Sequence, residues 1–167
     1  MQRFESKSKI FVVGLPRCGG QTITRALQML FPNYPVWHSP GNAWSKMGGG
    51  FLAATEVFAP IPWLERRYPG SIYLYNDRDE ESWFRSCQSV YGQSSQWNHP
   101  LWKYSLSQFM DYRKDYNFNQ TSFNQSIPPE RRKIINIIDN PNWAELCDAL
   151  QLDPPNMPFP KIDQFKI

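Results

Sequence analysis

One stretch near the start of the chain constrains the fold most: an apolar run, a loop containing glycines and an amphipathic run follow one another directly. Residues 9–14 read KIFVVG, the short apolar and β-branched composition of a buried parallel strand. The run after the loop has apolar residues at the spacing of one helix face, namely Ile23, Ala26, Leu27 and Leu30. Pro32 ends that run. We therefore predict a strand–loop–helix unit.

The loop of this unit has the residues of an anion site. Glycines let the backbone approach a ligand closely, and the amides at a helix N-terminus supply partial positive charge. A nucleotide-hydrolysing loop, G-x-x-x-x-G-K-[ST], would match at Gly14 and Gly19, but Gly20 and Gln21 replace its lysine and its metal-binding hydroxyl. Arg17 instead places a permanent cation inside the loop. The pattern disfavours ATP with Mg²⁺, while the glycines alone would equally suit a tight turn without a ligand.

Strand-like and helix-like segments alternate along the rest of the chain. Further strands are expected at 34–39, 51–57, 71–77 and 133–138, and further helices at 60–70, 79–92, 99–116 and 140–150. Asn140 is the expected N-cap of the last helix, with Pro141 at its first position. We expect a polar loop at 117–126 and a proline-rich tail extended along the surface. This order predicts one α/β domain over residues 1–167, with three layers and a mainly parallel five-stranded sheet.

Composition bears on partners and location. The net charge of +3 fits a small polyanionic ligand and is weak support for nucleic acid. The three cysteines are not spaced for a zinc site or a disulfide framework. Neither a signal peptide nor an apolar run of membrane-spanning length is visible. We expect a cytoplasmic protein with no metal, no nucleic-acid partner and no membrane partner.

The stretch FVVGLPRCGGQTITRAL (residues 11–27) resembles the 5′-phosphosulfate loop of sulfotransferases, especially the small bacterial members. The resemblance implies a P-loop NTPase-like sulfotransferase architecture and the donor 3′-phosphoadenosine-5′-phosphosulfate (PAPS). It places Arg17 where the family contacts the bridging oxygen of the donor. The residues that would hold the 5′-phosphosulfate are Arg17, Cys18, Gly19, Gly20, Gln21 and Thr22. The chain departs from the family at Gly20-Gln21, where two threonines are usual, and at Thr22, where an adenine-stacking tryptophan is usual.

The stretch YLYNDRDEESWFRS (residues 73–86) resembles the 3′-phosphate motif of the same family. Arg78 follows a strand, at the edge where α/β sheets bind ligands, and Ser86 comes eight residues later in a helix. A guanidinium and a hydroxyl can share one phosphate, and Ser86 is expected on the helix face opposite Trp83. In the alternative interpretation, Arg78 pairs with a neighbouring aspartate and Ser86 is solvated.

Two residues are candidates for the catalytic base. Aligning the segment before Arg78 with the family places its catalytic histidine on Glu56. A carboxylate at a strand end can take a proton from an acceptor hydroxyl if burial raises its pKa, although it could also be a surface glutamate. His38 is the second candidate, and its alternative is a structural histidine. The walls of an acceptor pocket are expected from Trp37, His38, Trp44 and residues 48–50.

The C-terminal stretch 128–163 also resembles the small bacterial members, but the late R-K-G loop of larger sulfotransferases is absent. Arg131, Arg132 and Lys161 are the residues that could replace it. The resemblance implies transfer of a sulfuryl group from PAPS to a hydroxyl or amine of a small-molecule or glycan acceptor, with a homodimer as one way to complete the acceptor site. The alternatives are a P-loop kinase that uses ATP and a catalytically inactive nucleotide-binding module.

Overall fold

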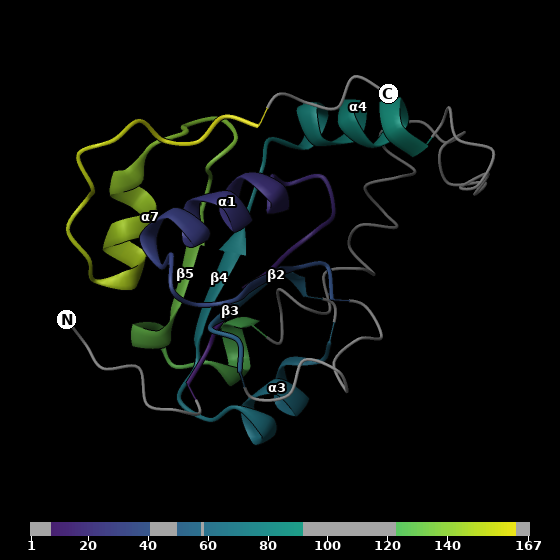
Figure 1. Cartoon of the computed structure of the whole chain (residues 1–167). Coiled ribbons are helices and arrows are strands. Elements are labelled where there is room, and N and C mark those ends of the chain that lie inside the picture. The colour runs from purple at the N-terminus through teal and green to yellow at the C-terminus, as the bar shows by residue number, and fades with distance from the viewer. Residues whose placement is uncertain (1–7, 41–49, 58, 92–122, 163–167) are drawn as a thin grey trace.

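A five-stranded parallel sheet forms the centre of the protein. The structure, a computed structural model, describes residues 8–40, 50–57, 59–91 and 123–162 (Figure 1). The strands are β1 (Ile10–Val13), β2 (Val36–His38), β3 (Ala53–Val57), β4 (Ile72–Asn76) and β5 (Arg132–Ile135). They lie in the order β2-β3-β1-β4-β5, and every neighbouring pair is parallel. The predicted α/β class and parallel sheet are confirmed.

Helices cover both faces of this sheet. They are α1 (Gly20–Leu30), α3 (Ile61–Arg67), α4 (Glu80–Tyr91) and α7 (Trp143–Leu150), with a short 3₁₀ turn at Pro129–Arg131. Helices α1 and α7 pack on one face, α3 packs on the other, and α4 lies beyond the carboxyl end of β4 (Figure 1). The helix predicted over 99–116 falls outside the described residues.

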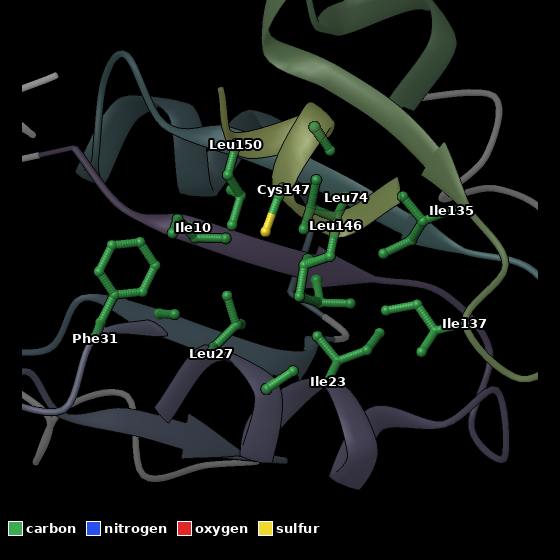
Figure 2. Packing of buried hydrophobic residues seen from close by; sticks show 14 of the residues in the cluster. Ile10, Ile23, Leu27, Phe31, Leu74, Ile135, Ile137, Leu146, Cys147 and Leu150 are labelled. Carbon is green, nitrogen blue, oxygen red and sulfur yellow. The ribbon is translucent and has the colours of Figure 1, made fainter. Parts of the chain in front are cut away.

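Alternating side chains of β1 join two of the core clusters, one on each face of the sheet. Ile10 and Val12 join the cluster under α1 and α7, and Phe11 and Val13 join the aromatic cluster under α3. Figure 2 shows side chains of α1, such as Ile23, converging on those of α7 from opposite sides of the first cluster. Because a central strand buried on both faces must be apolar throughout, the run IFVV has no polar position.

The structure corrects two element boundaries near the C-terminus. Strand β5 ends at Ile135, not at residue 138, because residues 137–139 form a turn. Helix α7 consequently begins later than predicted: its N-cap is Asn142, whose side-chain oxygen accepts a hydrogen bond from the Glu145 N–H (3.2 Å). Asn140 is not the cap, since its N–H donates to the Asn136 carbonyl inside the preceding turn (3.3 Å).

The stretches predicted as loop and tail are tied to the core by aromatic residues. Within the expected polar loop, residues 123–126 form a helical turn. This turn forms because Phe123 is buried and packs on Tyr75, with ring centroids 5.7 Å apart. The tail runs along the surface as predicted, and the Trp143 indole N–H donates to the Met157 carbonyl (2.7 Å). In the parts of the chain that are described, no helix combines the length and the apolar character needed to cross a membrane.

Candidate active site

The β1–α1 loop (residues 14–19) leaves the carboxyl end of the central strand and leads directly into α1. Gly19 is the N-cap of α1 with φ +87, and a Cβ there would lie 2.6 Å from Ile138 Cδ1, so only glycine fits. Within the described part of the chain, no side chain caps this helix N-terminus and no acidic residue lies in its first turn. The first amides of α1 therefore remain available to an anion.

Residues of α4 and of the segment before it hold this loop in place. Arg17 has a left-handed backbone (φ +68), and its carbonyl accepts a hydrogen bond from Arg78 Nη1 (2.9 Å). The Arg17 Nε donates to Ser86 Oγ (3.3 Å), and the Trp83 indole N–H donates to the Pro16 carbonyl (2.7 Å). These bonds from α4 and from Arg78 hold the left-handed residue in place.

Arg78 and Ser86 both contact the β1–α1 loop, which the sequence did not predict. The Arg78 guanidinium also donates to Ser82 Oγ (2.9 Å), and the Arg78 backbone N–H donates to Asp77 Oδ1 (2.9 Å). Ser86 is buried on the same side of α4 as Trp83, so its expected placement on the opposite face is wrong. Residues three apart on a helix are separated by only about 60° around the axis. Their shared binding of a 3′-phosphate stays a prediction.

Glu56 is directed at the loop by an irregularity in β3. Along β1, Val12 pairs with Thr55 and Val13 pairs with Val57, so Glu56 is the extra residue of a bulge, with φ +51. A bulge turns a side chain away from the regular alternation of a strand. The Glu56 side chain consequently lies against Gly20, where an added Cβ would meet Glu56 Cγ at 2.6 Å. The unusual Gly20 thus makes room for the carboxylate, and a lysine at this position would displace it.

The environment of Glu56 suits a base. Burial raises the pKa of its carboxyl, while electrostatic interactions with His38 and Arg17 act in the opposite direction. Its Oε2 atom lies 3.7 Å from His38 Nε2, and the two side chains are 20% and 29% exposed. The structure therefore brings the two candidate bases together, because β2 pairs with β3 so that His38 is level with Thr55.

Two threonines that the sequence interpretation missed complete this cluster. His38 Nδ1 lies 3.0 Å from Thr55 Oγ1, which lies 2.6 Å from Thr24 Oγ1. Thr24 in turn donates to the Gly20 carbonyl (2.7 Å). A signal was present, since Thr24 is a polar residue beside Ile23 and Leu27 on the buried face of α1, where a hydroxyl needs a partner.

A small cavity lies beneath the loop, with room for about one water molecule. It is lined by Val12, Val13, Gly14, Leu15, Cys18, Gly20, Glu56 and Asn76. Asn76 was also missed, and among the described residues neither polar atom of its buried amide has a hydrogen-bond partner. The side chain of Cys18 packs with Leu15 and Trp83, so Cys18 can offer a ligand only its backbone.

The structure rejects two of the proposed substitutes for the late phosphate loop. Arg131 forms a bidentate pair with Glu65 (2.8 and 2.9 Å) and donates to the Ser71 carbonyl (3.0 Å). Arg132 donates to the Phe123 carbonyl (3.1 Å). Both arginines therefore lie at the amino end of the sheet, away from the loop. Lys161 is exposed in the tail, and its role stays a prediction.

The expected acceptor walls are described only in part. Trp37 is 40% exposed on β2, and Gly50 is exposed. Trp44 and residues 48–49 lie outside the described residues. The acceptor pocket itself stays a prediction.

Comparison with known proteins identifies part of the chain. A family model described as a sulfotransferase domain matches residues 35–124, which are 90 of the 167 residues. This range contains His38, Glu56, Arg78 and Ser86, and begins after the β1–α1 loop. No curated protein matches the chain.

Proposed function

The chain belongs to the sulfotransferase family, and we propose on this premise that it transfers a sulfuryl group from PAPS to a hydroxyl or amine of a small-molecule or glycan acceptor. The observation that carries the proposal is the contact between the Glu56 carboxylate and Gly20, the first residue of α1. It puts a half-buried candidate base beside the amides that would hold the transferred group.

Each group of this site has a role in the proposed reaction. Bound PAPS supplies the sulfuryl group. The backbone of residues 17–22 would hold the 5′-phosphosulfate, and Arg17 would stabilise negative charge on the leaving oxygen. Glu56 would take the proton of the acceptor as its oxygen or nitrogen attacks sulfur. Arg78 and Ser86 would hold the 3′-phosphate.

The contact at Gly20 also separates this proposal from a kinase. A kinase loop of this type needs a lysine at that position to neutralise the phosphates of ATP. Here a side chain at position 20 collides with Glu56. The site therefore favours a donor whose transferred group carries less charge.

A thermal-shift comparison of adenosine 3′,5′-bisphosphate and Mg-ATP tests the donor. The bisphosphate at 100 times its Kd should stabilise the protein by about 2.7 kcal/mol, and Mg-ATP should not. Arg17→Gln should lose this shift. Arg85→Gln is the matched control, because Arg85 is an exposed residue of α4 that pairs with Glu81 and should leave the shift intact.

Turnover is tested with ³⁵S-labelled PAPS and a panel of phenols, amines and glycans. Labelled product is expected from the wild type, and Glu56→Gln should lower kcat by about 10²-fold or more. Stabilisation by Mg-ATP alone would indicate a kinase. Stabilisation by the bisphosphate without product from any acceptor would indicate a non-enzymatic binding module.

A further inference from the structure

Three short contacts in a row connect His38 to the first residue of α1. They join His38 Nδ1 to Thr55 Oγ1 (3.0 Å), Thr55 Oγ1 to Thr24 Oγ1 (2.6 Å), and Thr24 Oγ1 to the Gly20 carbonyl (2.7 Å). Thr24 and Thr55 are buried, so bulk water does not supply these partners. Each contact is short enough to require a hydrogen between its two atoms.

Counting the protons available to these four groups leaves one possible direction for each hydrogen bond. A carbonyl oxygen can only accept, so the single hydroxyl proton of Thr24 goes to Gly20. The 2.6 Å contact then needs the proton of Thr55, directed to Thr24. Thr55 has no proton left for His38, and the third contact must use an N–H on Nδ1. The hydrogen bonds therefore run in one direction, from His38 to Gly20.

We infer that these hydrogen bonds hold His38 as the Nδ1–H tautomer, so that the lone pair of Nε2 faces Glu56. This lone pair can accept the proton that Glu56 takes from the acceptor. The inference deepens the proposed function and rests on it for the origin of that proton. His38 is then a positioning residue that acts through Glu56, and not the competing base that its histidine chemistry suggested.

The proton balance of this step is complete. The acceptor O–H or N–H bond breaks, its proton passes to Glu56 and is shared with Nε2, and the electron pair forms the new bond to sulfur. The bond from sulfur to the donor oxygen breaks, and the bisphosphate leaves with that electron pair. The separation of 3.7 Å between Oε2 and Nε2 would have to shorten, as catalytic hydrogen bonds do when a substrate binds.

Nitrogen NMR of the histidine rings tests the tautomer without substrate or turnover. The chain has two histidines, His38 and His99, so a His99→Gln variant assigns the spectrum. At neutral pH His38 should show a protonated Nδ1 and an unprotonated Nε2. A neutral ring protonated at Nε2, or an imidazolium at this pH, overturns the inference.

Variants of the threonine in the hydrogen-bond chain give a second test of the His38 tautomer. Thr55→Val should shift the ring toward the Nε2–H tautomer, and Thr55→Ser, which keeps the hydroxyl, should retain the wild-type spectrum. Ser71→Ala is the control, because it removes a buried hydroxyl that bonds at the other end of the sheet, to Lys9 and Tyr68. An unchanged His38 spectrum in Thr55→Val would overturn the proposed hydrogen-bond chain. If Thr55→Val does not fold, the wild-type spectrum alone decides whether His38 is the Nδ1–H tautomer.

Measurements of sulfuryl transfer distinguish a failure of the hydrogen-bond inference from a failure of the proposed function. His38→Asn keeps a donor near the Nδ1 position and lacks Nε2, so kcat should fall by about 10²-fold while the KM for PAPS changes little. An unchanged kcat overturns the role of Nε2. The expected NMR spectrum in a wild-type protein that makes no sulfated product would refute sulfuryl transfer and leave the hydrogen-bond chain standing.

Discussion

Glu56 and Gly20 contact each other so closely that any side chain added at position 20 would displace Glu56. Glu56 Oε1 lies 2.7 Å from the place where a Cβ on Gly20 would stand. The same carboxyl is half-buried, and this partial burial makes its charged form less favourable. At the scale of single residues, the charged carboxylate of Glu56 should therefore lower the free energy of unfolding. An exposed glutamate at a strand end would not do so.

The partial burial of Glu56 predicts that Glu56→Gln raises the free energy of unfolding, by an amount that depends on pH. Because the pKa of Glu56 is raised above 4.5 in the folded protein, its protonated form stabilises the fold at low pH, and this contribution is lost as pH rises through the folded pKa. Glu56→Gln should therefore match the wild type below pH 4.5 and exceed its free energy of unfolding at neutral pH. The gain is about 1.4 kcal/mol for each unit of pKa shift.

Urea denaturation between pH 4 and 8 measures this difference. Glu81→Gln is the control, since its carboxyl is 60% exposed and should give no such trend. A Glu56→Gln protein that is less stable than wild type by the same amount at every pH would contradict the raised pKa.

The contact itself predicts a strong coupling between Gly20→Ala and Glu56→Ala. Gly20→Ala alone should destabilise the protein by about 1–3 kcal/mol, because the new methyl overlaps Glu56 Cγ. In the Glu56→Ala background, which lacks that atom, the same change should cost little. A double-mutant cycle measures the coupling. Gly50→Ala is the control, since nothing lies within 4 Å of its added Cβ, and additive effects at positions 20 and 56 would argue against the contact.

At the scale of elements, helices position the site through their ends and not only through their buried faces. Helix α1 presents its uncapped N-terminus at the loop, and α4 contacts two consecutive loop carbonyls through Trp83 and the nearby Arg78. Helix α7 is different, because the Asn142 side chain accepts a hydrogen bond from the Glu145 N–H at its N-terminus. Of α1, α4 and α7, the helix whose described N-terminus has no side-chain cap is thus α1, which faces Glu56.

The cap of α7 predicts unequal effects of two asparagines. Asn142→Ala should lower the free energy of unfolding by about 1 kcal/mol, because the Glu145 N–H loses its acceptor. Asn140→Ala should have a much smaller effect, since Asn140 bonds through its backbone. Chemical denaturation of the two variants makes the comparison, and the opposite order would restore Asn140 as the cap.

At the scale of the whole molecule, the sheet is buried between two apolar clusters while its edges remain exposed. Central strands β1 and β4 contribute side chains to both clusters. The edge strand β5 instead leaves Ile134 51% exposed. The stability of the fold, and with it the geometry at the carboxyl end of the sheet, therefore depends on the central strands.

Two leucine-sized residues on neighbouring strands test this distribution. Leu74→Ala should destabilise the protein by about 2–5 kcal/mol. Leu74 is fully buried on the face of the sheet that α1 and α7 cover. Ile134→Ala should change the free energy of unfolding by less than about 0.5 kcal/mol. Similar losses at both positions, measured by denaturant unfolding, would contradict the layered core.

The alternating apolar patterns were sufficient to predict the parallel sheet, the helices flanking it and the loop between β1 and α1. These features follow from local spacing, and local spacing is readable in a chain. The close approach of Glu56 to Gly20 depends on a bulge in β3, and the hydroxyl chain depends on β2 pairing with β3 while α1 packs above them. Such contacts join residues from three elements, and periodicity along one element carries no information about them. Sequence thus indicated which residues could act, and tertiary packing decided that Glu56 lies against Gly20 and that His38 lies beside Glu56.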